Sequence, residues 1–378
     1  MGPDAVTFPQ VSWVATGIAV AVALVGTWAG TRWIVQHAER LDLLDEPNER
    51  SSHHRVTPRG GGLAFVVAFE FCAVLWTALG YLPASLGVPL ILGILGIATI
   101  GWIDDRRTIG SGVRLLVHLA VAAGASTWWV LRFPHHGTSS GLEAAGPVIT
   151  IGLIAASTLL IAWSINLYNF MDGLDGLATS QATLAFAAFA LLVTSADTSG
   201  VTLLTTGLGT LSWTFAAATL GFLLWNLPPA RIFMGDVGSG TLGFTFAWLG
   251  VVAITSPGLP PLLLPMLLAP FLVDATATLF ARIMEKKRWW AAHREHMYQR
   301  AVRYGYGHAH VTASMVALSA VGGLLHALAQ GNLQIERFLA LAWVAILMVL
   351  WWKLRIRWPI PAPSNGVHTQ AAERTPHA

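Results

Sequence analysis

The residue types that bind metal ions, phosphates and nucleotides gather in five short polar segments of an otherwise apolar chain. The second segment contains two adjacent aspartates, Asp104 and Asp105. Two carboxylates at the edge of an apolar span are costly unless a cation lies beside them, and magnesium is usually held by one or two carboxylates together with substrate phosphates. The pair therefore predicts metal-assisted chemistry on a phosphate compound, although Arg106 and Arg107 could instead neutralise it as a surface ion pair.

The third polar segment, residues 166–178, is the richest in ligand-type side chains. Two asparagines, two aspartates and two glycines lie within eleven residues, among them Asn166, Asn169, Asp172 and Asp175. Capping of the following helix accounts for one of them at most, and the spacing is not that of a calcium-binding loop. The other side chains are therefore expected to bind a ligand.

The fourth segment, residues 226–240, is expected to lead into a helix. Asn226 and Phe233 precede Asp236, and glycines stand at positions 235, 238 and 240. Glycines leave backbone N–H groups accessible at a helix start, where a phosphate can bind. Asp236 is expected either to cap this helix, as Ser239 could, or to hold the metal ion.

The first segment, residues 45–62, combines positive charge with glycine. Its candidate substrate-binding residues are Arg50, His53 and Arg59, and Gly60–Gly62 would let backbone N–H groups approach an anion. The alternative is a basic loop beside the membrane without a catalytic role.

The fifth segment, residues 293–300, carries two histidines. His293 and His296 are three positions apart and would share one face of a helix, with Arg300 one turn further. Two histidines are too few for a zinc site, so this face and the neighbouring Arg294 are expected to contact phosphate. The alternative is a basic amphipathic helix on the membrane surface.

The elements that position these segments are predicted to be membrane-spanning helices. Hydrophobic residues make up 54% of the chain and charged residues only 11%, whereas about 25% are charged in soluble domains. Spans need about 20 apolar residues. The sequence thus predicts an all-α polytopic membrane protein with about eleven transmembrane helices, at roughly 11–33, 61–82, 86–103, 113–131, 147–165, 179–195, 201–225, 239–256, 259–283, 311–329 and 336–353.

The basic residues set the predicted orientation. Alternate threading of the spans leaves only Arg132 and Arg337 on one side and collects the other loop-borne basic residues, with all five polar segments, on the opposite side. By the positive-inside rule that side is cytoplasmic. We therefore expect an external N-terminus, a cytoplasmic C-terminus and an active site in cytoplasmic loops.

The remaining polar features are few. A single catalytic domain is predicted over residues 1–358, followed by a disordered cytoplasmic tail at 359–378. Cys72, the only cysteine, excludes an internal disulfide and a cysteine-based zinc site. Glu70 and Asp274 lie inside predicted spans and have no assigned role.

Taken in order from about Asp45 to Arg303, the five segments resemble the motifs of the polyprenyl-phosphate N-acetylhexosamine-1-phosphate transferases. This superfamily, glycosyltransferase family 4, includes the muramoyl-pentapeptide enzyme of peptidoglycan synthesis. The resemblance implies a UDP-N-acetylhexosamine donor, an undecaprenyl phosphate acceptor held in the membrane lipid, and Mg2+ as cofactor, with Mn2+ as a substitute. No nucleic acid partner is expected, and a homodimer stays open.

The resemblance also implies roles for individual residues. Asp236 would be a magnesium ligand, and Asp104 and Asp105 would act near the metal and the attacking lipid phosphate, as metal ligands or as a base. Asn169, Asp172 and Asp175 would line the nucleotide pocket, with Phe233 stacked on uracil, and Asn166 and Asn226 would be further substrate-binding residues. His293 and His296 would face the pyrophosphate or the sugar.

The fifth segment narrows the branch of the family. The muramoyl-pentapeptide enzymes have a run of histidines there, whereas this chain has His293-Arg294-Glu295-His296. It looks more like the branch that initiates O-antigen, teichoic acid or similar polysaccharides at the bacterial inner membrane, with GlcNAc, QuiNAc or FucNAc as open donor sugars. The alternative class is a transporter or flippase of lipid-linked sugars, which would need polar residues along the spans. Here they collect at the cytoplasmic ends.

Overall fold

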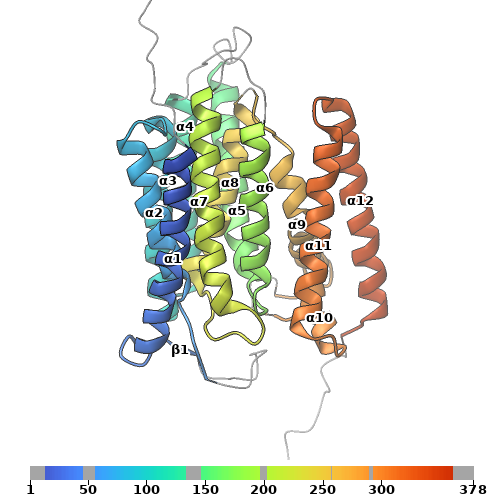
Figure 1. Ribbon diagram of the computed structural model, residues 1–378. Helices are drawn as coiled ribbons and strands as arrows, with labels where there is room; N and C mark the ends of the chain where they lie inside the picture. Colours follow the sequence, from blue (N-terminus) through green and yellow to red (C-terminus); the bar gives the residue numbers. More distant parts are fainter. Residues whose placement is uncertain are drawn as a thin grey trace, which may run out of the picture.

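The polypeptide folds into long helices that run alternately up and down one bundle (Figure 1). The computed structural model describes residues 13–45, 56–132, 146–195, 202–256, 258–288 and 293–360. Within these ranges the helices are α1 (Trp13–His37), α2 (Gly62–Ala78), α3 (Ala84–Arg106), α4 (Ser111–Arg132), α5 (Pro147–Met171), α6 (Leu177–Ser195), α7 (Thr202–Asn226), α8 (Asp236–Thr255), α9 (Leu263–Met284), α10 (Met297–Arg303), α11 (His308–Ala329) and α12 (Leu333–Arg357). The predicted all-helical class is confirmed.

A two-stranded antiparallel ribbon joins α1 to α2. Strand β1 (Leu44–Asp45) pairs with β2 (Thr57–Pro58), with Leu44 opposite Pro58. The residues between the strands include two of the predicted substrate-binding residues, Arg50 and His53, which lie outside the described residues. So does most of the predicted C-terminal tail, from residue 361 onward.

The eleven predicted spans each coincide with one long helix. Nine of these helices are long and apolar enough to cross a bilayer, and the apolar stretches of the other two, α2 and α6, are shorter. Large apolar side chains such as Phe338 and Leu341 of α12 are exposed on the outside of the bundle, where lipid rather than water suits them. The chain is therefore a polytopic membrane protein, while the number of crossings and the sides of the termini stay predictions.

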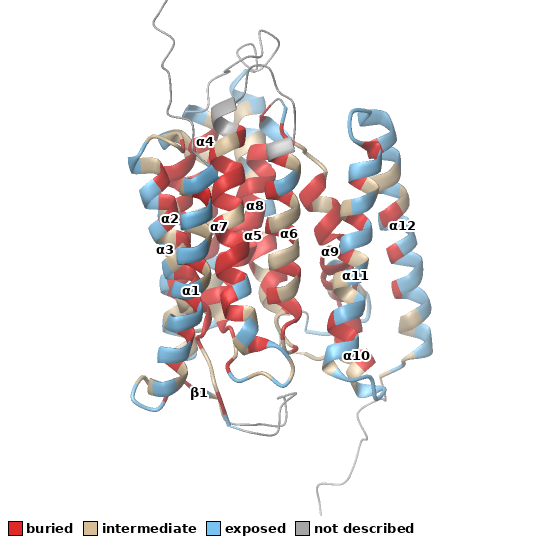
Figure 2. Ribbon diagram, in the orientation of Figure 1, coloured by how far each residue is buried: buried red, intermediate tan, exposed pale blue. Residues whose placement is uncertain are grey.

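Helix α8 forms the centre of the bundle. Every residue from Val237 to Ala253 is buried, as the buried colouring of the central helices in Figure 2 shows. Small residues let its neighbours come close. A Cβ at Gly243 would lie 2.5 Å from the backbone oxygen of Ser164 on α5, and one at Gly93 on α3 would overlap the ring of Phe244.

The first turn of α8 is held equally closely. A Cβ at Gly101 of α3 would lie 2.6 Å from the carbonyl carbon of Asp236, and one at Gly62 would lie 2.5 Å from Cα of Gly238. The N–H group of Gly62 also donates to the carbonyl oxygen of Met234 at 2.9 Å. The ends of α2, α3 and α8 that carry polar segments therefore meet at one end of the bundle.

Helices α9, α11 and α12 pack together beside α6 (Figure 1). Trp343, Leu347 and Trp351 of α12 form a second hydrophobic cluster with residues of α9. The short helix α10 lies at the polar-segment end of this group and contacts α11 and α12.

Candidate active site

Three aspartates and two arginines form one cluster at the start of α8. Arg59 forms an ion pair through Nε with Oδ1 of Asp105 at 2.9 Å and donates a hydrogen bond from Nη2 to Oδ1 of Asp236 at 2.8 Å. Arg114 of α4 bridges Oδ2 of Asp104, at 2.7 Å, and Oδ2 of Asp236. The charges thus alternate in sign, and Asp236 lies between the two guanidinium groups.

Asp105 reaches this cluster as a cap for α8. Its side chain is fully buried. Oδ1 accepts from the N–H of Asp236 at 2.8 Å and Oδ2 accepts from the N–H of Val237 at 3.1 Å. The prediction that Asp236 or Ser239 caps this helix is therefore wrong, because the cap comes from α3 and Oγ of Ser239 bonds to the carbonyl oxygen of Gly235.

The glycine-rich segments pack rather than expose backbone donors. The N–H groups of Gly61 and Gly62 donate to the carbonyl oxygens of Phe233 and Met234, both at 2.9 Å. The N–H groups of Asp236 and Val237 donate to Asp105, and that of Gly238 to the carbonyl oxygen of Gly235. The expected anion site on these N–H groups is therefore not formed. Close helix packing accounts for the glycines instead.

The carboxylates at the start of α8 suit a magnesium ion that is held partly by substrate phosphates and water. In the part of the chain that the structure describes, no three acidic, histidine or cysteine side chains form a ready-made metal cage. Magnesium seldom needs one, since one or two carboxylates, waters and substrate phosphates suffice. Asp104 and Asp236 share Arg114 and each keeps unused lone pairs, whereas Asp105 is committed to the helix cap. The pair Asp104 and Asp236 fits the ion better than Asp105 does.

Asn169 and Asp172 border the same cluster. Asn169 donates from Nδ2 to Oγ of Ser239 at 3.3 Å. Asp172 follows the last residue of α5, and its pKa is raised well above the ordinary value by burial and by the nearby carboxylates of Asp236 and Asp105. A neutral carboxyl group at this position can donate a hydrogen bond to a ligand oxygen.

Asp175 and Asn226 tie loops together. Asn226 is buried, accepts from the N–H of Gly176 at 3.1 Å and donates from Nδ2 to the carbonyl oxygen of Ile232 at 2.9 Å. Oδ2 of Asp175 accepts from the N–H of Ala230 at 3.1 Å. The structure thus gives both residues a positioning role, and the predicted contacts of Asp175 with the nucleotide and of Asn226 with substrate stay predictions.

Phe233 and Asn166 are two further predicted substrate-binding residues. Phe233 is half-buried, and its N–H donates to the carbonyl oxygen of Pro58 at 2.8 Å. Asn166 is half-buried on α5 and donates from Nδ2 to the carbonyl oxygen of Ala162 at 2.7 Å. Neither contact tests the predicted binding of the uracil base or the sugar.

The two histidines of the fifth segment do not share a helix face. Helix α10 begins at Met297, so His296 is its N-cap and His293 precedes it. Their rings are nevertheless 4.9 Å apart, centroid to centroid. The pKa of His293 is lowered to about 3 and that of His296 to about 4, in both cases mainly by burial. Both rings are therefore neutral near pH 7, so they add no positive charge to the face that was expected to contact phosphate.

A buried aspartate determines where α10 begins. Asp274 of α9 accepts from the N–H of Met297 at 2.7 Å and from that of Tyr298 at 3.3 Å. Tyr298 in turn donates from its hydroxyl to the carbonyl oxygen of Phe170 at 2.8 Å. The histidine segment is thereby fixed beside the end of α5, close to Asp172.

Sequence reasoning missed Arg114 and His118 because both lie inside a predicted apolar span. His118 is buried one helical turn after Arg114, and its Nδ1 has no hydrogen-bond partner among the described residues. An ionisable side chain inside a span is itself a signal of function. Applied to α4, that rule would have found both residues.

Comparisons with known proteins agree with this arrangement. Residues 88–254, from α3 to α8, match the family model described as glycosyl transferase family 4. The chain is 28% identical over 306 residues to the "Probable undecaprenyl-phosphate N-acetylglucosaminyl 1-phosphate transferase" of Bacillus subtilis, covering 77% of this chain and 78% of that protein. It is 26% identical over 279 residues to the "Undecaprenyl-phosphate alpha-N-acetylglucosaminyl 1-phosphate transferase" of Escherichia coli K12, covering 71% of each chain.

A third relative is more similar in sequence. The "Phospho-N-acetylmuramoyl-pentapeptide-transferase" of Heliobacterium modesticaldum is 34% identical over 281 residues, which are 69% of this chain and 80% of that protein. The matched family region contains Asp104, Asp105 and Asp236, the carboxylates that the structure brings together. On both grounds, the chain belongs to glycosyl transferase family 4.

Proposed function

We propose that this protein transfers an N-acetylhexosamine 1-phosphate from a UDP-sugar to undecaprenyl phosphate and releases UMP. The observation that carries the proposal is the cluster of three carboxylates and two arginines at the start of α8. Family membership makes the chain a glycosyl-1-phosphate transferase, and the names of two relatives state an undecaprenyl-phosphate substrate and an N-acetylglucosaminyl 1-phosphate group. UDP-GlcNAc is therefore the first donor to test.

The chemistry requires two anions to meet. One oxygen of the lipid phosphate attacks the phosphorus that bears the sugar, the bond from that phosphorus to the UMP oxygen breaks, and UMP leaves with the bonding electrons. Phosphoryl transfer depends mainly on positioning and charge stabilisation. Arg59 and Arg114 supply fixed positive charge on two sides of Asp236. Asp104 and Asp236 would hold magnesium, which offsets the charge repulsion between the two substrates.

Each remaining residue of the site is assigned either to binding substrate or to positioning the helices. Asp105 positions the first turn of α8 through its two backbone hydrogen bonds. Asn169, Asp172 and Phe233 are assigned to the nucleotide. The raised pKa of Asp172 favours its protonated form, which would donate a hydrogen bond. We assign His293, His296 and Arg294 to the sugar or the pyrophosphate; Nη2 of Arg294 is buried without a partner among the described residues.

The proposal includes a place in the cell. The basic loops support a site on the cytoplasmic face of the bacterial plasma membrane, with the N-terminus outside. Transfer to a lipid carrier there would begin the synthesis of a cell-envelope polysaccharide such as O-antigen or teichoic acid.

The test is UMP release by the purified full chain with magnesium, undecaprenyl phosphate and a panel of UDP-N-acetylhexosamines. Asp236→Asn is compared with Asp42→Asn, because Asp42 is exposed in the turn after α1. Release should require both substrates, persist in Asp42→Asn, and fall by about 10²-fold or more in Asp236→Asn, as expected for loss of a charge-stabilising group. Folded protein that moves a lipid-linked sugar across a bilayer without releasing UMP would instead establish a flippase.

A further inference from the structure

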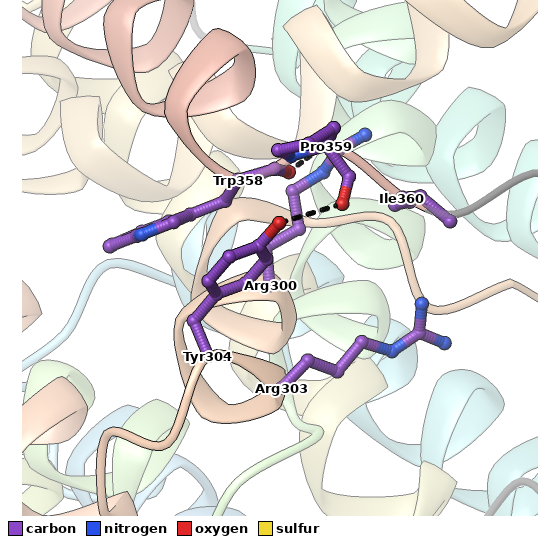
Figure 3. Close-up of a pocket in the computed structure, with 6 residues that line it drawn as sticks. All are labelled: Arg300, Arg303, Tyr304, Trp358, Pro359 and Ile360. Carbon is purple, nitrogen blue, oxygen red and sulfur yellow. Dashed lines mark hydrogen bonds between the residues drawn. The ribbon is translucent and has the colours of Figure 1, made fainter.

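A polar pocket lies outside the carboxylate cluster, between α10 and the end of α12 (Figure 3). Its volume is about 360 Å³. Two arginines and two aromatic residues dominate its lining, which consists of Arg300, Arg303, Tyr304, Trp358, Pro359 and Ile360. None of these residues has a part in the proposed transfer reaction.

The pocket carries an excess of positive charge. The Arg300 side chain is 4% exposed, donates from Nη1 to the carbonyl oxygen of Trp358 at 2.8 Å, and keeps Nη2 4.0 Å from Oε2 of Glu295. The Glu295 carboxylate is already paired with Arg282 and Lys287. It therefore neutralises the pocket only in part.

Arg303 supplies the free charge. Its side chain is exposed, and it makes no hydrogen bond or ion pair with another residue that the structure describes. Figure 3 shows its side chain extending away from Tyr304 and Trp358. A guanidinium group in this state presents several N–H donors to a phosphate, with which it can form paired hydrogen bonds.

The surroundings place the pocket at the level of lipid headgroups. Trp352 and Ile356 of α12 are exposed apolar side chains on the lipid-facing surface just before it. Trp358 and Tyr304 follow, with ring centroids 6.0 Å apart, and aromatic side chains concentrate at membrane interfaces. Basic pockets between helices at such an interface are suited to anionic lipid headgroups.

We propose that this pocket binds the phosphate of an anionic membrane lipid. Arg303 contacts the phosphate, Arg300 contributes buried positive charge, and the aromatic rings lie beside the glycerol region. Arg300 also donates from Nε to the carbonyl oxygen of Glu295 at 2.9 Å. A bound lipid would therefore hold together the end of α12, helix α10 and the segment that ends at His296.

The first experiment measures binding without activity. The purified full chain in detergent is titrated with phosphatidylglycerol, phosphatidylcholine or inorganic phosphate, and bound molecules are counted by native mass spectrometry. One phosphatidylglycerol molecule should bind in preference to phosphatidylcholine. Arg303→Ala should lower the affinity for phosphatidylglycerol about five-fold, which is the effect of one basic residue near a charged lipid surface. Arg303→Lys should retain most of the affinity.

A matched control is Lys353→Ala, because Lys353 is an exposed cation near the same end of α12 that does not line the pocket. It should leave the tight site unchanged. Equal binding of both lipids, equal losses in Arg303→Ala and Lys353→Ala, or inorganic phosphate that competes as well as the lipid would each overturn the proposal. A second readout, stimulation of UMP release by phosphatidylglycerol, rests on the proposed function. No UMP release with any lipid would count against that function, whereas the binding results alone decide the site.

Discussion

Asp105→Asn distinguishes an aspartate that works through protein structure from one that binds metal. The native side chain accepts two hydrogen bonds, from the N–H groups of Asp236 and Val237, and its Oδ1 forms an ion pair with Nε of Arg59. An asparagine has one accepting oxygen, and its amide nitrogen brings hydrogens toward a donor. At least one N–H at the start of α8 therefore loses its partner inside the protein.

The size of the effect follows from these contacts. Loss of a helix cap costs about 0.5–2 kcal/mol, and loss of a negative charge at a helix N-terminus costs about 0.3–1 kcal/mol more. The fully buried position of Asp105 leaves no water to replace the lost bond. The free energy of unfolding should fall by about 1–3 kcal/mol, which lowers Tm by a few degrees in a chain of this size.

The assay combines thermal unfolding with a magnesium titration of UMP release. Asp105→Asn should lower Tm and kcat, because Asp236 shifts, but leave unchanged the magnesium concentration that gives half the maximal rate. Asp236→Asn, the same chemical change on a proposed ligand, should raise that concentration. An Asp105→Asn variant with native Tm and a magnesium requirement raised as far as in Asp236→Asn would refute the positioning role.

Three further predictions follow from the same geometry. Arg114→Ala should lower kcat by about 10²–10³-fold, and Arg114→Lys should recover only part, because lysine keeps the charge but cannot bridge two carboxylates; a fully active alanine variant would contradict this. Gly235→Ala should abolish activity, because φ is +78° and a Cβ would overlap the Asp105 carboxylate. Gly305→Ala, at φ +93° with open space around it, should lower stability only by the cost of a left-handed backbone conformation, about 1–2 kcal/mol. Burial lowers the pKa of His293 to about 3 and that of His296 to about 4. The unfolded chain, in which the histidine pKa is about 6.5, therefore binds more protons, and the free energy of unfolding should fall as the pH drops from about 6.5 toward 4. A flat profile of Tm against pH in this range would count against neutral rings.

The helices could be predicted from sequence because each long apolar run has to pair its backbone internally within lipid. The ends of the helices are harder to predict. The predicted span 61–82 ends at Ala78 in the structure, where Leu79 closes the helix and Gly80 takes a φ of +75°. The fifth segment was predicted as one helix, but Asp274 binds the N–H groups of Met297 and Tyr298 and so fixes the helix start after His296. That contact joins residues more than twenty positions apart, which local periodicity does not reveal.

The sequence predicts which aspartates belong to the site, but it does not predict the separate role of each one. The cost of carboxylates at a span boundary singles out Asp104 and Asp105, and the family resemblance groups Asp236 with them at the metal. Only the folded chain shows that Asp105 points at the backbone of α8, while Asp104 and Asp236 share Arg114. Adjacent residues on a helix project in different directions, so a pair that looks equivalent in sequence has two different roles in space.

Asp105 and Asp274 solve the same physical problem at two places. Each is a buried carboxylate near or within a membrane-spanning helix, and each accepts the first two N–H groups of a later helix, α8 or α10. Those N–H groups have no partner within their own helix, and a side chain from an earlier helix satisfies them here. A remote aspartate therefore fixes the position of each helix start, and with it Asp236 in one case and His296 in the other. Carboxylates inside the spans of this protein need not touch substrate, because they set the geometry of the residues that do.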